Sequence, residues 1–249
     1  MSKVIAVLGA GTGLGVSVAR RFGKEGFRVA LVARRRDRLD DLVARLAEEG
    51  VEAAAFPADL SDPAQVPALV AAVRDRFGRI DVVEYGPIGG DQSFTPAARL
   101  DATTLEGLSR LLLLTPVEVF RAVLPEMTER GDGALLMTTG YSAVRPMPHL
   151  SGFGPVMAAA RNYLYSLHGE LAGTGVYAGT LTVAAMITGS EQAETAAESA
   201  AAADADFGGL EVTAVHPDEL AEHYWDMYTR RDRVEQAHPA ELTPRDDRS

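Results

Sequence analysis

The chain has 249 residues, a formal net charge of −11, a 47% share of hydrophobic residues and no cysteine. This length suits one large α/β domain, and no apolar run approaches the ~20 residues that a membrane-spanning helix needs. The lack of cysteine excludes disulfides, thiolate metal sites and a cysteine nucleophile, and the acidic balance argues against a nucleic-acid-binding surface. No signal peptide is visible, so we expect a cytoplasmic protein that binds neither nucleic acid nor membrane.

Apolar runs alternate with amphipathic segments along most of the chain, which is typical of a parallel sheet covered by helices on both faces. The predicted strands cover residues 4–8, 27–33, 51–56, 80–83, 134–138 and 177–183, with a short final strand at 212–215. The predicted helices follow the first strand and cover 37–49, 63–77, 104–130 (interrupted near Pro116), 154–172 and 216–231. We therefore expect an α/β fold with a doubly wound parallel sheet of about seven strands. It would form a single domain over residues 1–235, with a mobile alanine-rich flap at 190–210 and a polar C-terminal tail at 236–249.

A glycine-rich turn joins the first strand to the first helix, and it consists of Gly9, Ala10, Gly11, Thr12, Gly13, Leu14 and Gly15. Such a turn presents backbone N–H groups and the positive end of a helix dipole to a pyrophosphate. The spacing is G-x-x-x-G-x-G and not the common G-x-G-x-x-G, because Leu14 occupies the last position of that fingerprint. We predict a dinucleotide-binding turn; the alternative is a glycine-rich turn that binds no ligand.

Five motifs occur together in an order and spacing typical of one family. They are Gly9-x-x-x-Gly13-x-Gly15, Asp59-Leu60, Gly78-Arg79-Ile80-Asp81, Arg121-Ala122-Val123-Leu124-Pro125 and Ser166-Leu167-x-x-Glu170-Leu171. With these motifs the chain resembles the short-chain dehydrogenase/reductase family across nearly its whole length. The resemblance implies a single-domain Rossmann fold that binds a nicotinamide cofactor. It also implies a homodimer or homotetramer with an interface formed by the helices near residues 117–130 and 154–172.

The residues after the second strand bear on the choice of cofactor. NAD-preferring domains usually place an acidic residue at the end of this strand, but here Ala33 is followed by Arg34 and Arg35. A guanidinium suits the doubly charged 2′-phosphate of NADP(H), because its geometry is bidentate and no carboxylate repels the phosphate. We therefore predict NADP(H); the alternative is a solvated basic entry to the next helix.

The resemblance also implies roles for three further residues at the cofactor. Asp59 corresponds to the family aspartate that meets the adenine amino group, and Leu60 would lie beside the adenine ring. Thr188 corresponds to the family threonine that reaches the nicotinamide carboxamide.

The catalytic pattern of the family is altered in this sequence. The slots of the catalytic asparagine, serine, tyrosine and lysine fall, by the same resemblance, at Leu112, Gly140, Phe153 and Met157. Phenylalanine has no exchangeable proton, and methionine has no charge that could lower the pKa of a neighbouring hydroxyl. No lysine occurs anywhere after Lys24, so the standard tyrosine–lysine pair is missing.

Three other residues are candidates for a substitute proton donor. Tyr141 follows the fifth strand and His149 lies in the loop before the long helix, and each carries a transferable proton. Tyr85 follows the fourth strand, where it would be near the nicotinamide. The alternative for each residue is that it only lines or caps the pocket.

Three functions are compatible with these features. The first is an atypical NADP(H)-dependent oxidoreductase that acts on a small carbonyl, imine or alkene without the usual tyrosine and lysine. The second is a non-redox lyase, isomerase or cyclase that uses Glu84, Tyr85, Tyr141 and His149. The third is a catalytically inactive protein whose NADP(H) occupancy is sensed by a partner.

Overall fold

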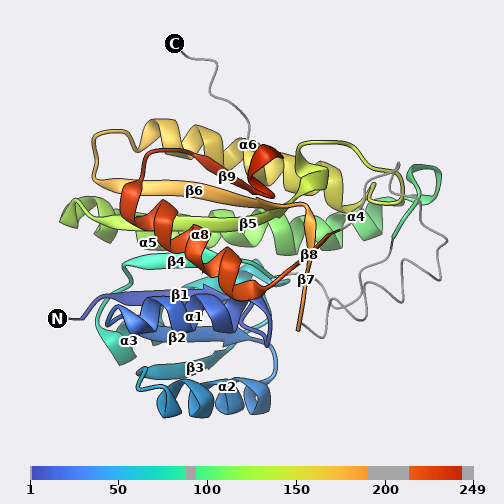
Figure 1. Ribbon diagram of the computed structural model, residues 1–249. Helices are drawn as coiled ribbons and strands as arrows, with labels where there is room; N and C mark the ends of the chain where they lie inside the picture. The colour runs from blue at the N-terminus through green and yellow to red at the C-terminus, as the bar shows by residue number, and fades with distance from the viewer. Residues whose placement is uncertain (1, 88–93, 190–212, 243–249) are drawn as a thin grey trace.

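The computed structural model describes residues 2–87, 94–189 and 213–242. Its centre is a sheet of seven parallel strands in the order β3-β2-β1-β4-β5-β6-β9, with helices on both faces (Figure 1). The strands are β1 (Val4–Leu8), β2 (Arg28–Ala33), β3 (Ala53–Pro57), β4 (Val82–Tyr85), β5 (Gly133–Gly140), β6 (Val176–Val183) and β9 (Glu235–His238). The predicted doubly wound α/β fold is confirmed. The strand order reverses between β1 and β4, which makes the carboxyl ends of these two strands the expected ligand-binding crevice.

Two buried apolar clusters hold one layer of helices on each face of the sheet. The face that lies in front in Figure 1 carries α1 (Leu14–Lys24), α2 (Arg36–Glu48) and α8 (Pro217–Arg230). The opposite face carries α3 (Val66–Phe77), α5 (Thr115–Arg130) and α6 (Phe153–Glu170). The central strands β1, β4 and β6 are buried along their whole length and β2 and β5 along most of it, which explains why they read as apolar runs instead of alternating ones.

The predicted helix over residues 104–130 is interrupted, as expected. It consists of α4 (Ala102–Ser109), a π-helical segment (Arg110–Leu114) and α5, which begins at Thr115. Pro116 lies in the first turn of α5, directly after the π-helical segment, and without an N–H it cannot donate a hydrogen bond to the preceding turn.

The C-terminal part of the chain differs from the prediction. Residues 213–215 do form a strand, β8 (Thr213–Val215), but it pairs with β7 (Ala185–Ile187) in a separate small sheet. The last strand of the main sheet is β9, which pairs with β6 and spans the expected boundary, so that its residues 236–238 fall in the expected tail. The structure places the boundary later than the expected residue 235, because residues 236–238 pair with β6 in a short strand that has no apolar run in the sequence. The folded part extends at least to a 3-10 turn at Ala240–Leu242. The predicted flap at 190–210 lies outside the described residues.

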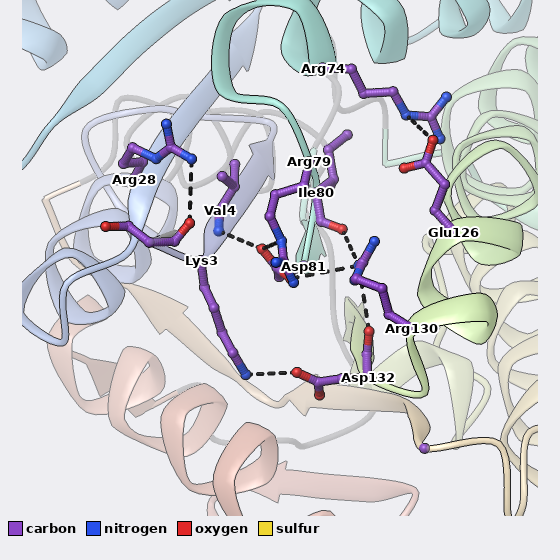
Figure 2. Close-up of polar contacts among 12 residues, drawn as sticks. Lys3, Val4, Arg28, Arg74, Arg79, Ile80, Asp81, Glu126, Arg130 and Asp132 are labelled. Carbon is purple, nitrogen blue, oxygen red and sulfur yellow. Dashed lines mark hydrogen bonds and ion pairs between the residues drawn. The ribbon is translucent and has the colours of Figure 1, made fainter.

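A buried carboxylate ties several elements together at the amino ends of the strands (Figure 2). Asp81, which is 1% exposed, accepts a hydrogen bond of 2.8 Å from the backbone N–H of Val4 at the start of β1. The guanidinium of Arg79 binds the same carboxylate through Nε and Nη2, and Arg130 approaches it to 3.6 Å from the end of α5. The amino ends of the strands are therefore tied together by ion pairs, and the candidate site lies at the carboxyl ends.

Candidate cofactor and active site

The glycine turn lies at the carboxyl end of β1, beside β2 and the segment after β4. The N–H groups of Gly9 and Ala10 both donate to the carbonyl of Val32 at 2.9 Å. Gly9 has φ +101°, and a Cβ at this position would lie 2.6 Å from Cα of Pro87. Only glycine fits here, because another residue would be strained and would also collide with backbone.

The turn leads directly into the N-terminus of α1. The helix begins after Gly13, and no described side chain caps it. Gly11 and Thr12 are exposed, and Leu14 packs partly buried against the core. A Cβ on Gly15 would lie 2.9 Å from Cα of Ala10, so the helix approaches the turn as closely as backbone allows. An N-terminus without a side-chain cap suits a phosphate, which would accept hydrogen bonds from its backbone N–H groups.

The arginine cluster and the predicted adenine site lie at the adjacent strand ends. Arg34 and Arg35 are both exposed after β2. The Oδ1 atom of Asp59, after β3, accepts hydrogen bonds from the N–H (2.9 Å) and the hydroxyl (2.7 Å) of Ser61. These bonds, with the charge of Arg34, lower the pKa of Asp59, so this carboxylate is ionised at neutral pH. Leu60 is buried. The structure thus brings Arg34 and Asp59 close enough to interact electrostatically.

The segment after β7 reaches the glycine turn. The hydroxyl of Thr12 donates to the carbonyl of Gly189 at 3.3 Å. The N–H and hydroxyl of the neighbouring Thr188 donate to the carbonyl of Val215, at 3.0 and 3.2 Å. Because a hydroxyl also has acceptor lone pairs, Thr188 retains the capacity to accept a hydrogen bond from an amide.

The four residues in the expected catalytic slots also lie together, but they form an apolar surface. Leu112 and Phe153 are buried in one cluster, and Met157 packs against it. The backbone N–H of Gly140 donates to Sδ of Met157 at 3.2 Å, which is a weak acceptor. None of these four side chains offers a transferable proton.

Two of the three candidate proton donors lie in the connection between β5 and α6. Tyr141 is half-buried and begins the 3-10 turn Tyr141–Ala143. His149 is also half-buried, and its backbone adopts φ +63°, which is uncommon for a residue with a side chain. Its Nδ1 atom is buried and has no hydrogen-bond partner among the described residues. An unpaired ring nitrogen on a strained backbone is typical of a group held ready for a ligand.

The third candidate, Tyr85, does not face an open site. Its side chain is 2% exposed in the core, where its hydroxyl donates to the carbonyl of Leu111 and burial raises its pKa well above the usual value. Glu84 is equally buried (1% exposed) on the opposite face of β4. Its carboxyl group accepts a 3.1 Å hydrogen bond from Thr138, which is in turn bonded to the hydroxyl of Tyr224. Tyr85 is therefore not accessible as a proton donor, because the two side chains point to opposite faces of β4 and helices cover both faces.

A buried polar network that the sequence did not reveal borders the apolar cluster. Glu235 of β9 binds Arg161, which lies one helical turn after Met157 on α6, and it also accepts from Tyr165. Its other oxygen accepts a 2.5 Å hydrogen bond from Thr182, which is 2.8 Å from the hydroxyl of Thr139. The network fixes α6 against β5, β6 and β9. Arg161 and Tyr165 are spaced i, i+4 and share one helix face, but nothing in the sequence shows that Glu235 meets them.

A doubly wound parallel sheet with a glycine-rich turn at its switch point defines the class of dinucleotide-binding α/β proteins. A model of the short chain dehydrogenase family matches residues 3–199. The chain belongs to this family.

Known proteins with similar sequences and structures agree with this assignment. A protein of Streptomyces coelicolor, provisionally named a ketoacyl reductase, is 32% identical over 177 residues, which cover 70% of this chain and 67% of that protein. A solved structure of a variant of actinorhodin polyketide ketoreductase with NADPH is 25% identical, has a TM-score of 0.83, and is matched over 95% of this chain and 94% of that one. An alcohol dehydrogenase from Thermococcus sibiricus, complexed with 5-hydroxy-NADP, is 26% identical with a TM-score of 0.76, over 95% and 96% of the two chains.

The chain spans 51% to 67% of the length of the first three curated relatives it matches. Among the helices that the structure describes, none has the length and apolar character to cross a membrane.

Proposed function

We propose that this protein is an NADP(H)-dependent oxidoreductase that acts on a small carbonyl, imine or alkene without the tyrosine–lysine pair of its family. The observation that carries the proposal is the N-terminus of α1, where no described side chain caps the helix, with Arg34 and Asp59 at the adjacent strand ends. The helix end suits a pyrophosphate, and the guanidinium suits a 2′-phosphate. The NADPH and 5-hydroxy-NADP complexes of the related structures support the same cofactor.

Replacing Arg34 with alanine is expected to weaken NADPH binding by about tenfold, because a hydrogen bond to a charged phosphate is lost at an exposed position. NADH binding should be unchanged, since NADH has no 2′-phosphate. Calorimetric titration of wild type and variant with NADPH, NADP⁺, NADH and NAD⁺ measures both effects. Arg36→Ala is the matched control, because Arg36 is a neighbouring exposed arginine that pairs with Asp40. Equal wild-type affinity for NADH and NADPH would contradict the predicted preference.

The apolar character of the catalytic slots restricts the chemistry of the substrate. Hydride transfer itself needs only the reduced nicotinamide and a positioned acceptor, whereas the protein supplies orientation and a proton. With Leu112, Phe153 and Met157 at these slots, the proton must come from another residue or from the substrate. A protonated imine, or an acceptor with an internal acid, meets this condition. For a simple carbonyl, Tyr141 or His149 would have to donate.

If a carbonyl compound is the substrate, Tyr141→Phe or His149→Gln is expected to lower kcat by about 100-fold, which is typical for the loss of a general acid. The measurement follows oxidation of NADPH with a panel of β-ketoacyl thioesters, small ketones and cyclic imines. Tyr163→Phe serves as the control, because Tyr163 stacks on Phe120 away from these slots. If both variants keep wild-type kcat with ketones, neither residue is the proton donor.

The same apolar cluster favours a second candidate, a protein that binds NADP(H) without turnover and presents its occupancy to a partner. NADPH binding without oxidation across the whole panel would favour this function over the first. A non-redox enzyme has less support, because two of its four expected groups, Glu84 and Tyr85, are buried in the core.

A further inference from the structure

Two histidines and a glutamate come together beside the last strand of the sheet, apart from the residues of the proposed cofactor site. Glu219 and His223 are four residues apart on α8 and therefore lie on one face of the helix. His238 ends β9, and α8 packs next to this strand and β6 (Figure 1). One ligand atom from each of the three side chains lies within 4.8 Å of the other two.

Two of the three distances within this cluster are close to those around a single tetrahedral ion. Nε2 of His223 lies 3.3 Å from Nδ1 of His238, and Oε1 of Glu219 lies 3.6 Å from the same Nδ1. Two nitrogens bound at about 2.0–2.1 Å to one tetrahedral zinc ion lie about 3.4 Å apart. The two separations from Nδ1 of His238 are therefore near the expected value, and the third, between Glu219 and His223, is at most 4.8 Å.

The chemistry and burial of the three groups favour a divalent transition metal. Imidazole nitrogens bind Zn²⁺ and other late first-row transition metals better than they bind Mg²⁺ or Ca²⁺. The carboxylate of Glu219 supplies a negative charge to balance that of the metal. The side chain of His238 is 14% exposed and that of Glu219 is 59% exposed, so the cluster is enclosed on the strand side and open to solvent on the helix side. An ion can enter from solvent, and water can fill the remaining coordination position.

We propose that Glu219, His223 and His238 form a binding site for Zn²⁺ with water as the fourth ligand. The metal would join the edge strand β9 to α8. β9 has only four residues, and it carries Glu235, which holds Arg161 of α6. Zinc at this position would therefore stabilise the edge of the sheet and, through Glu235, the helix beside the catalytic slots. The site does not depend on whether the protein binds NADP(H).

The test uses the full chain without a histidine tag, treated with EDTA and dialysed, and titrated with ZnCl₂ by calorimetry. Wild type is expected to bind one Zn²⁺ per chain. Loss of an outer-shell partner alone typically costs 10–100-fold in metal affinity, so loss of a ligand in His223→Ala should cost at least about tenfold. Glu219→Gln should act in the same direction, and its exposed position makes it a safe variant if His223→Ala folds poorly.

His216→Asn is the matched control. His216 lies at the N-cap of the same helix, outside the cluster, and asparagine is an equally good cap. This variant should bind Zn²⁺ as wild type does. A zinc-dependent rise in Tm should also occur in wild type and His216→Asn but be absent in Glu219→Gln combined with His223→Ala. Wild type that binds no Zn²⁺, or equal binding by wild type and the double variant, would overturn the proposal.

Discussion

Replacing Glu84 with glutamine is expected to raise the free energy of unfolding by about 3 kcal/mol at pH 7. Burial raises the pKa of Glu84 from 4.5 to about 8, and the hydrogen bond from Thr138 only partly offsets this effect. No ion pair to Glu84 occurs among the residues that the structure describes. At pH 7 the native protein therefore holds a proton that the unfolded chain has released. Glutamine keeps an oxygen that can accept from Thr138, and it has no proton to release on unfolding.

The effect should depend on pH in a defined direction. Below pH 4.5 the carboxyl group is protonated in both states, so it costs no stability. As the pH rises towards 8, the unfolded chain ionises first and the native state becomes progressively less stable relative to it; above pH 8 the penalty is constant. The gain from Glu84→Gln should therefore grow from about 1 kcal/mol at pH 5.5 to about 4–5 kcal/mol at pH 8.5.

Urea unfolding of wild type and variant at these two pH values measures the difference. Glu235→Gln is the contrasting variant, because Glu235 is also buried but pairs with Arg161. Its loss should destabilise the protein, since an unpaired guanidinium remains in a partly buried place. A Glu84→Gln effect that is the same at both pH values would show that Glu84 is ionised in the native state.

The fold could be predicted from the sequence because its determinants are local. The apolar strands β1, β2, β4, β5 and β6 are largely buried on both faces, and the glycine turn after β1 has few other physical explanations. β9 has a different origin. Only Ala237 of its four residues is a buried apolar residue, and Glu235 is held by Arg161, 74 residues earlier in the chain. A strand held by pairing with β6 and by polar contacts of Glu235 with distant residues has no periodic signal of its own.

The candidate site could be predicted only in part, for a similar reason. The positions of Phe153 and Met157 followed from counting along one helix, and the structure places them together with Leu112 in one cluster. Tyr85 and Glu84 stand at the end of β4, where the sequence does not show how far the layers of helices extend. Both are covered, Tyr85 by the segment around Leu111 and Glu84 by Tyr224 of α8 through Thr138. Burial at a strand end depends on tertiary packing, which a sequence pattern does not contain.

At the amino ends of the strands, away from the candidate site, Asp81→Ala is expected to lower the free energy of unfolding by about 3–5 kcal/mol. Breaking a buried ion pair leaves the charges of its partners uncompensated. Arg79 and Arg130 would lose their shared carboxylate, and the N–H of Val4 would lose its acceptor (Figure 2). Chemical denaturation of wild type and variant at one pH measures this loss.

Asp132→Ala is the control for Asp81→Ala. It shows whether removing another carboxylate in the same region costs as much stability as removing Asp81. Asp132 binds Lys3 and Arg231 but is 35% exposed, so its removal should cost about 1 kcal/mol or less. Both variants, studied at a temperature where they remain folded, should bind NADPH with wild-type affinity, because the glycine turn and Arg34 lie at the carboxyl ends of the strands. A similar loss of stability in both variants would contradict the central role of Asp81. Weaker NADPH binding by folded Asp81→Ala would instead mean that the contacts of Asp81 with the start of β1 help to position the glycine turn at the other end of that strand.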